Sequence, residues 1–473
     1  MSGELDRSVK RRDLLKAGAV LGLGIPGIGA FLAACSNSAA SPSAASSAAA
    51  SAVASQPNAA SATAAASAPS SAASAAADPT VTVNLYDTMP QATQTEWLNT
   101  WYPQFQKLHP TVSIKETNGG IENAQTLRQQ VAANTDTSPD MAWMESGEMG
   151  AYSDAGLLAD VDSWLNGKPG VKADIFPSLV TLCSYNGKVQ SLPWMTNNCA
   201  MLINTDAFAA AGVAIPDQDP TKTWTWEDFA AACQAITEKA GMKGYLMNAT
   251  QNGWDAWLFH AWLATAGGTF LSDAGDPGFA GPEGLETMTY LQGLVTKGYT
   301  SPLDKGWELT LWFGKKAAIV CNGPWNLPDL QKFTDFKFTV VPFPRHKQPA
   351  TNIGGDNLFV FKHSDDKVKG AFAYADFMLS KDFQVAFNIQ SGNLPVTKTA
   401  TQDPAYQAQL DKYPYLRGWV NGVPYGVARS ALPQSSDAQT AFGKDAWDPI
   451  ILQGADVQAS LDAAAKAVTA LKS

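Results

Sequence analysis

The segment Gly314-Lys315-Lys316-Ala317-Ala318-Ile319-Val320-Cys321-Asn322-Gly323-Pro324-Trp325 decides how the rest of the chain is interpreted. Small and β-branched residues follow a pair of lysines, a pattern that predicts a short buried strand. Gly and Pro then end the strand, and Trp325 is the first large side chain after it. A Trp on such a turn offers a flat face and an N–H donor, although a core Trp that caps the strand fits equally well.

The abundance of Trp favours a binding role for this turn. The chain contains 15 Trp residues, more than a core of this size needs. Several of the others lie in turns rich in Gly, Asn and Pro, namely Trp194, Trp254, Trp257, Trp307 and Trp447. We therefore expect some of these rings to face a ligand.

The Gly314–Trp325 segment resembles the F-x-x-G-x-A-A-[MI]-x-x-x-G-x-W motif of the family 1 extracellular solute-binding proteins, the sugar-capturing receptors of ABC importers. Further motifs of that family follow the same order here. They are the Y-x-G-K hairpin at Tyr185–Lys188, the buried Leu192-Pro193 and the T-W-x-[ED] helix start near Thr223–Asp228. Ile203-Asn204 departs from the usual Tyr-Asn. The resemblance covers nearly all of residues 79–473.

The chain order supports the fold that this resemblance implies. Strand and helix patterns alternate from Val81 onward, which indicates an α/β domain with a mostly parallel sheet. The resemblance implies a two-lobe periplasmic-binding-protein fold of type II, with helices flanking a mixed, mostly parallel sheet in each lobe and a hinge of several crossings. Residues 79–194 and 354–394 are expected to form the N-lobe, and residues 195–353 and 395–473 the C-lobe.

Candidate ligand-binding residues lie at the predicted strand ends and crossings, where α/β sheets bind ligands. Flat rings stack on the C–H faces of a sugar, and planar polar groups hydrogen-bond its hydroxyls. The candidates, several of them placed by the resemblance, are Asp87, Glu145, Ser146, Trp194, Asn198, Trp254, Trp257, Trp325, Gly355, Asp356, Asn357 and Arg429.

The N-terminus predicts export and lipid anchoring. Arg11-Arg12 precedes an apolar run from Ala17 to Ala34, and Leu32-Ala33-Ala34-Cys35 resembles a bacterial lipobox, so residues 1–35 are interpreted as a signal peptide with lipidation at Cys35. An uncleaved signal anchor is the alternative, and both twin-arginine and Sec export stay open. Residues 36–78 are almost entirely Ser and Ala, which predicts a disordered tether. We thus expect an extracytoplasmic protein held at the cell membrane.

Composition narrows the function classes. The net charge of −10 argues against nucleic-acid binding. Beyond Cys35, the four cysteines fit no zinc pattern, and their pairing in disulfides cannot be assigned from sequence: Cys183, Cys199, Cys233 and Cys321. No cofactor is expected, because the sequence has neither a P-loop nor a dinucleotide fingerprint.

Two alternatives accompany the sugar-receptor prediction. An exported glycosidase would also combine aromatic rings with carboxylates, although the sequence has no G-x-S-x-G elbow and its four His residues show no metal spacing. Arg429 and the Gly-rich turns would also suit a phosphate, as in glycerol-3-phosphate receptors. We expect a monomeric receptor with no enzymatic activity, whose partners are a carbohydrate and the permease subunits of an ABC importer.

Overall fold

The computed structural model describes residues 80–472 except for 88–98, 120–123, 249–253 and 304–307. The chain divides into two units, Met1–Ala73 and Ser74–Ser473, and all described residues belong to the second. The predicted signal segment, Cys35 and the predicted tether lie outside the described residues. No helix in the described part is both long and apolar enough to span a membrane.

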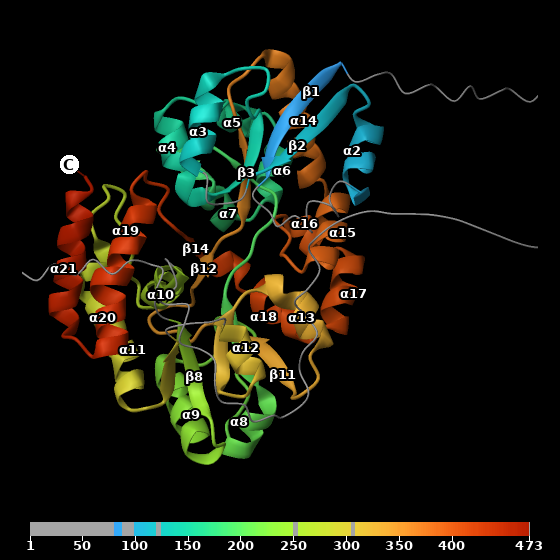
Figure 1. Cartoon of the computed structure of the whole chain (residues 1–473). Helices are drawn as coiled ribbons and strands as arrows, with labels where there is room; N and C mark the ends of the chain where they lie inside the picture. The colour runs from blue at the N-terminus through green and yellow to red at the C-terminus, as the bar shows by residue number, and fades with distance from the viewer. Residues whose placement is uncertain (1–79, 88–98, 120–123, 249–253, 304–307, 473) are drawn as a thin grey trace, which may run out of the picture. The chain divides into compact units, whose positions relative to one another are not determined.

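The first of two five-stranded sheets has the order β2-β1-β3-β13-β6, and Figure 1 labels its strands β1, β2 and β3. β1 (Val81–Asp87) runs parallel to both β2 (Val112–Asn118) and β3 (Met141–Glu145). β13 (Asp356–Val360) runs antiparallel to β3 and to β6 (Leu192–Pro193). Because β13 is reversed, its first residue lies beside the last residue of β3. Carboxylates at three strand termini therefore meet at one edge of the sheet.

The second sheet has the order β11-β7-β10-β8-β9. β10 (Ala317–Asn322) lies at its centre, between β7 (Ala200–Asn204) and β8 (Lys243–Asn248), and every residue of β10 is buried. This confirms the strand predicted before Trp325. The outer strands are β11 (Phe338–Val341) and β9 (Thr300–Leu303). Both sheets mix parallel and antiparallel pairs, and the α/β class is confirmed.

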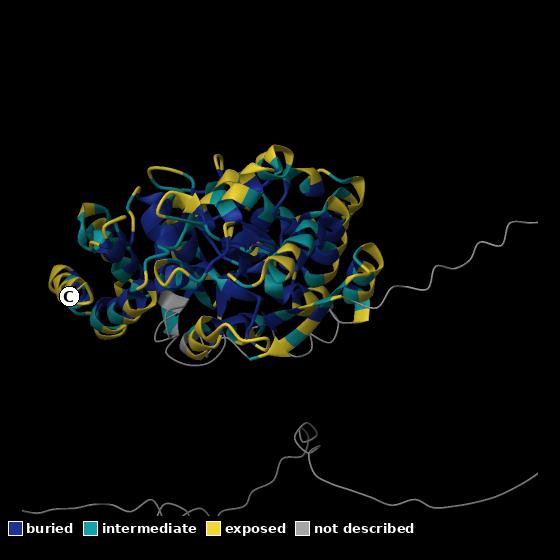
Figure 2. Ribbon diagram, turned by 90° about the horizontal axis from the view of Figure 1, so that it is seen from above, coloured by how far each residue is buried: buried dark blue, intermediate teal, exposed yellow. Residues whose placement is uncertain are grey.

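Helices cover the sheets, and the buried residues lie toward the inside (Figures 1 and 2). α14 (Asp365–Leu379) packs on β1 of the first sheet, and α9 (Trp226–Lys239) packs on β8 of the second. α9 begins with a capping box between Thr225 and Asp228, inside the segment Thr223–Asp228 where the sequence predicted a helix start. The four described cysteines are free and buried.

Three chain segments pass between the two sheets and lie side by side. In chain order they are the first crossing at Thr196-Asn197, the second at Gly354 and the third at Leu394. Thr196 and Leu394 exchange backbone hydrogen bonds of 3.3 and 2.9 Å, and Asn197 and Gly354 exchange bonds of 3.1 and 2.9 Å. Gly355 has a φ of +119°, and a Cβ there would lie 2.5 Å from the Met195 carbonyl oxygen. Only glycine fits this close approach. The three segments form a narrow ribbon that connects the sheets.

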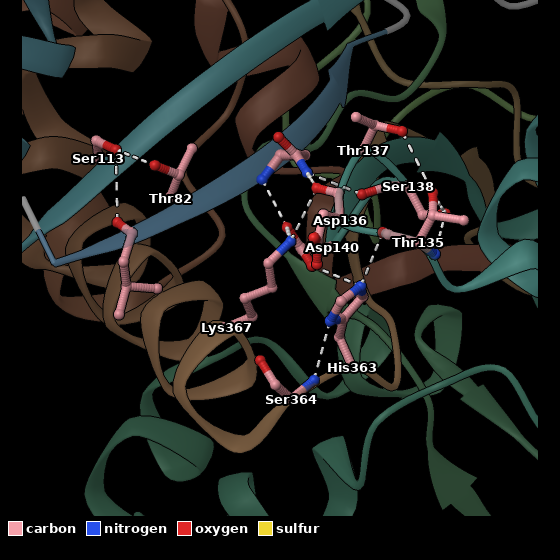
Figure 3. A network of polar contacts seen from close by, with 12 residues as sticks. Thr82, Ser113, Thr135, Asp136, Thr137, Ser138, Asp140, His363, Ser364 and Lys367 are labelled. Carbon is pink, nitrogen blue, oxygen red and sulfur yellow. Dashed lines mark hydrogen bonds and ion pairs between the residues drawn. The ribbon is translucent and has the colours of Figure 1, made fainter.

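The start of β3 carries a buried polar network (Figure 3). The Asp140 carboxylate is 1% exposed; one oxygen accepts the Asn84 N–H at 2.7 Å and the Lys367 ammonium at 3.1 Å. Nearby, His363 Nε2 lies 3.1 Å from the Thr135 carbonyl oxygen, and its Nδ1 accepts the Ser364 N–H at 2.9 Å. A buried charge needs such partners, so the Pro139-Asp140 motif has a structural role.

Candidate ligand-binding site at the ends of β1, β3 and β13

Three carboxylates form one side of the candidate site. Asp87 is the last residue of β1, Glu145 the last of β3 and Asp356 the first of β13, where it is register partner of Glu145. Asp87 is fully buried, Asp356 is half-buried and the Glu145 side chain is 42% exposed. Strand pairing thus brings together carboxylates that are far apart in the sequence.

The environment of this cluster opposes the ionisation of Asp356. Burial raises the pKa of Asp356 to about 7, and the negative charges of Glu145 and Asp87 add to that rise. Arg429 acts in the opposite direction and lowers the same pKa. A carboxyl whose ionisation is opposed in this way is characteristic of functional sites.

Arg429 joins the carboxylates to the aromatic part of the site. It follows β14 (Gly426–Ala428), which pairs in parallel with β12 (Thr351–Ile353). Its Nη2 donates to Glu145 Oε2 at 2.9 Å, and its guanidinium carbon lies 5.7 Å from the centre of the Trp257 ring. The arginine therefore fixes the position of both groups, through an ion pair and a cation–π contact.

Two Trp rings form the aromatic part of the candidate site. Trp257 belongs to α10 (Trp254–Thr265) and Trp325 to the short 3-10 helix η4 (Pro324–Asn326) that follows β10. Their ring centres are 5.9 Å apart and their planes differ by 32°. Trp325 is half-buried, whereas Trp257 is 7% exposed. The partly exposed Trp325 ring agrees better with the binding interpretation than with that of a core residue.

Glycines allow both rings to approach the backbone. A Cβ at Gly323 would overlap the Trp325 ring, and a Cβ at Gly354 would lie 3.0 Å from the Trp257 ring. These two glycines were not among the predicted site residues. In the sequence each of them is only a glycine next to a strand end. That position does not indicate that an aromatic ring packs on the glycine backbone.

Three predicted site residues lie elsewhere, and the structure corrects them. Trp194 is 1% exposed in the core, with its ring centre 4.5 Å from that of Trp143. Asn198 is 1% exposed, and its amide donates to the Trp419 carbonyl oxygen at 2.9 Å. Asn357 is fully buried and follows Asp356 in β13, so its side chain points to the opposite face of the sheet. Position near a crossing did not reveal the direction of these side chains.

The remaining predicted residues are placed as follows. Ser146 is 1% exposed and begins the turn η2 (Ser146–Glu148) directly after Glu145. Gly355 contributes backbone at the connecting ribbon. The Trp254 side chain lies outside the described part of the structure, as does Trp307. The structure also adds Glu148, whose pKa is raised by burial first and by Glu145 among its neighbours.

The arrangement suits an uncharged polyol better than a metal ion. Rings stack on apolar C–H surfaces while carboxylates accept hydrogen bonds from hydroxyls. Arg429 supplies donors on the same side. In the described residues no group of His, Cys, Asp and Glu has the arrangement of a metal site.

Comparison with known proteins places the chain among binding proteins. The profile of the family described as bacterial extracellular solute-binding protein matches residues 100–412. A putative binding protein of Brucella abortus is 23% identical over 365 residues, covering 74% of this chain and 83% of the relative. The sn-glycerol-3-phosphate-binding periplasmic protein UgpB of Escherichia coli is 25% identical over 280 residues, which is 56% of this chain and 59% of UgpB.

Solved structures give the same fold. The cyclic alpha-maltosyl-1,6-maltose binding protein of Arthrobacter globiformis has a TM-score of 0.72 and 27% identity, covering 83% of this chain and 99% of that protein. The sugar-binding protein MalE of Xanthomonas citri has a TM-score of 0.70 and 15% identity, covering 83% of this chain and 98% of MalE. These similarities confirm the predicted two-lobe fold.

Proposed function

Because the chain belongs to the bacterial extracellular solute-binding protein family, we propose that it is an extracytoplasmic receptor that captures a sugar between its two lobes and delivers it to an ABC importer. The observation that carries this proposal is that Arg429 connects a pair of Trp rings to a carboxylate cluster. Arg429 contacts the Trp257 ring, which lies beside the Trp325 ring, and it bonds Glu145, whose charge acts on Asp356 together with that of Asp87. Rings and hydrogen-bonding carboxylates at one site fit the two faces of a pyranose.

The charge of the site favours a neutral sugar over a phosphate. Arg429 is already paired with Glu145, and the two other carboxylates lie within electrostatic range of each other. A phosphate placed there would meet like charges, which raises the free energy of the bound state. A glycerol-phosphate ligand, which the similarity to UgpB makes the second candidate, therefore fits less well.

The mechanism follows from the position of the site. The carboxylates belong to the first sheet, whereas the Trp rings lie next to strands and helices of the second. A sugar that contacts both groups gains contacts only when the lobes come together, so binding favours the closed state. The closed form is then the one recognised by the permease, and ATP is hydrolysed elsewhere.

Export, lipid anchoring and the tether are inferred from the sequence. The twin-arginine pattern and lipobox support a signal peptide and a lipid anchor on Cys35, with the Ser/Ala-rich tether leading to the lobes. We expect the protein to be a monomer. We also expect it to release its sugar intact, because a receptor binds its ligand without cleaving it. Recovery of shortened sugar after incubation with the protein would instead indicate a carbohydrate-active enzyme.

A thermal-shift screen of the full chain tests the function. The compounds are neutral mono- and oligosaccharides, with glycerol 3-phosphate and sugar phosphates as the competing class. A ligand present at 100 times its dissociation constant stabilises the folded state by about 2.7 kcal/mol, which is a readable rise in melting temperature. Stabilisation by a neutral sugar supports the proposal. Stabilisation by phosphorylated compounds alone would contradict the sugar assignment.

A further inference from the structure

The connecting ribbon is held by two fully buried side-chain amides. Gln384, on α15 (Lys381–Ser391), donates to the Trp194 carbonyl oxygen at 2.6 Å and accepts the Val396 N–H at 2.9 Å. Asn352, in β12, accepts the Cys199 N–H at 2.9 Å and donates to the Trp257 carbonyl oxygen at 3.0 Å. The Gln384 bonds fix the first and third crossings, and the Asn352 bonds fix the first and second.

The two amides act on opposite sides of the ribbon. α15 packs against α14, which covers the first sheet, so Gln384 belongs to the first lobe. Cys199 directly precedes β7 of the second sheet, and Trp257 belongs to a helix that packs on β12. Asn352 therefore anchors the ribbon where it enters the second lobe. The segment left between the two anchors is short, Met195–Asn198 in the first crossing.

Trp257 is tied to the ribbon twice. Its carbonyl oxygen accepts the Asn352 amide, and its ring edge lies 3.0 Å from where a Cβ of Gly354 would be. Gly354 in turn exchanges both backbone hydrogen bonds with Asn197 of the first crossing. Trp257, which carries one of the two candidate ligand-stacking rings, is thus bonded to the second crossing and connected through Gly354 to the first.

We propose that Asn352 is a positioning residue that makes the Trp257 end of α10 and the second-lobe end of the hinge one rigid body. Lobe bending is then confined to the segment between Asn352 and Gln384. Each buried amide bonds backbone groups that would otherwise be buried without a partner, so the loss of either amide destabilises the attachment. The use of Trp257 in sugar stacking rests on the proposed function, whereas the rigidity of the hinge does not.

The test measures the distance between the lobes in the ligand-free full chain by double electron–electron resonance. Spin labels are placed on exposed positions by Lys115→Cys on β2 and Glu238→Cys on α9. Cys35→Ala removes the remaining thiol outside the described residues, and the four described cysteines are buried. The variants are Asn352→Ala, which removes both bonds, and Asn352→Asp, which keeps the acceptor for Cys199 and loses the donor to Trp257.

The matched control is Asn204→Ala. Asn204 is also buried and its side chain accepts one backbone N–H at 3.0 Å, but it caps α8 (Thr205–Ala211), away from the ribbon. We expect a broader distance distribution in both Asn352 variants and a wild-type distribution in the control. Wild-type distributions in both Asn352 variants, or equal broadening in the control, would overturn the proposal. No sugar is present, so a protein that binds none still gives a decisive result.

Discussion

A carboxylate lies at each end of β3, and the two carboxylates have opposite charge environments. At the start, Asp140 is buried and its charge is balanced by Lys367 and a backbone N–H. At the end, Glu145 lies near Asp356 and Asp87, and burial together with these neighbouring negative charges raises the pKa of Asp356 to about 7. A buried carboxylate whose charge is balanced by a cation is typical of a structural site, whereas a carboxyl whose ionisation is opposed by its neighbours is typical of a functional site. A buried acidic residue can therefore have either a structural or a functional role, and its charged neighbours decide which.

Removal of the cation at the structural end should give the largest effect. Lys367→Met leaves the Asp140 carboxylate buried with a backbone N–H and without its ammonium partner. We expect urea unfolding to show a loss of about 2–3 kcal/mol, less than a fully buried pair would give because the Lys367 side chain is 16% exposed. Lys369→Met is the control, since its pair with Asp366 is 76% exposed on both sides. Equal stability of the two variants would contradict a structural role for Asp140.

Removal of a ring at the other end should act on binding instead. Trp325→Ala should weaken sugar binding by roughly 1–3 kcal/mol and leave the protein folded, because the ring is only half-buried. The sugar from the thermal-shift screen would be titrated by calorimetry. Trp447→Ala is the contrasting variant, since Trp447 is 1% exposed in the core and its loss should lower stability. If the Trp325→Ala protein were unfolded, Trp325 would have to be interpreted as a core residue and not as a ligand-binding one.

The pH dependence of the free energy of unfolding should reveal the titration of the Asp356 carboxyl group. Its folded pKa of about 7 is above its ordinary value of 3.8, so between these values the folded state binds more protons than the unfolded state. The free energy of unfolding must then fall as the pH rises through this window and level off above it. Urea unfolding at pH 5 and pH 8 should show this loss in the wild type and a smaller one in Asp356→Asn. An equal loss in both proteins would show that another group titrates.

Glu145→Gln should give the smallest change in stability. The Glu145 side chain is 42% exposed, so the loss of its ion pair with Arg429 should change the free energy of unfolding by less than about 1 kcal/mol. The substitution also removes a negative charge beside Asp356, which should lower the pKa of Asp356 and shift the pH-dependent loss to lower pH. An unchanged pH profile would show that the two carboxyls do not interact.

The fold was predictable because its signals are local and repeated. The β10 strand, the α9 helix start and the alternation of strands with helices all follow from short patterns. The candidate site was predictable only in part. Asp87 and Glu145 were predicted because they follow strand patterns, and Asp356 because of the family resemblance. The structure places all three at strand ends, where α/β sheets bind ligands.

The errors concern side-chain direction. Trp194 and Asn198 flank the same crossing as the candidate site, yet one ring packs against Trp143 and the other side chain bonds Trp419. Asn357 follows Asp356 directly, and the alternation of a strand turns it to the other face. The role of Asn352 depends on a bond to Trp257, which is 95 positions away in the sequence. Such contacts are set by tertiary packing and leave no local pattern.

Isothermal titration of the wild type and Asp356→Asn with the neutral sugar from the screen tests the central claim most directly. If the carboxylate end of β3 binds the ligand, the wild type should bind and leave the sugar intact, and the variant should bind at least about tenfold more weakly, which corresponds to about 1.4 kcal/mol. Its melting temperature should not fall, because Asp356 is not needed to balance another charge. Equal affinity in the two proteins would contradict the assignment of the site.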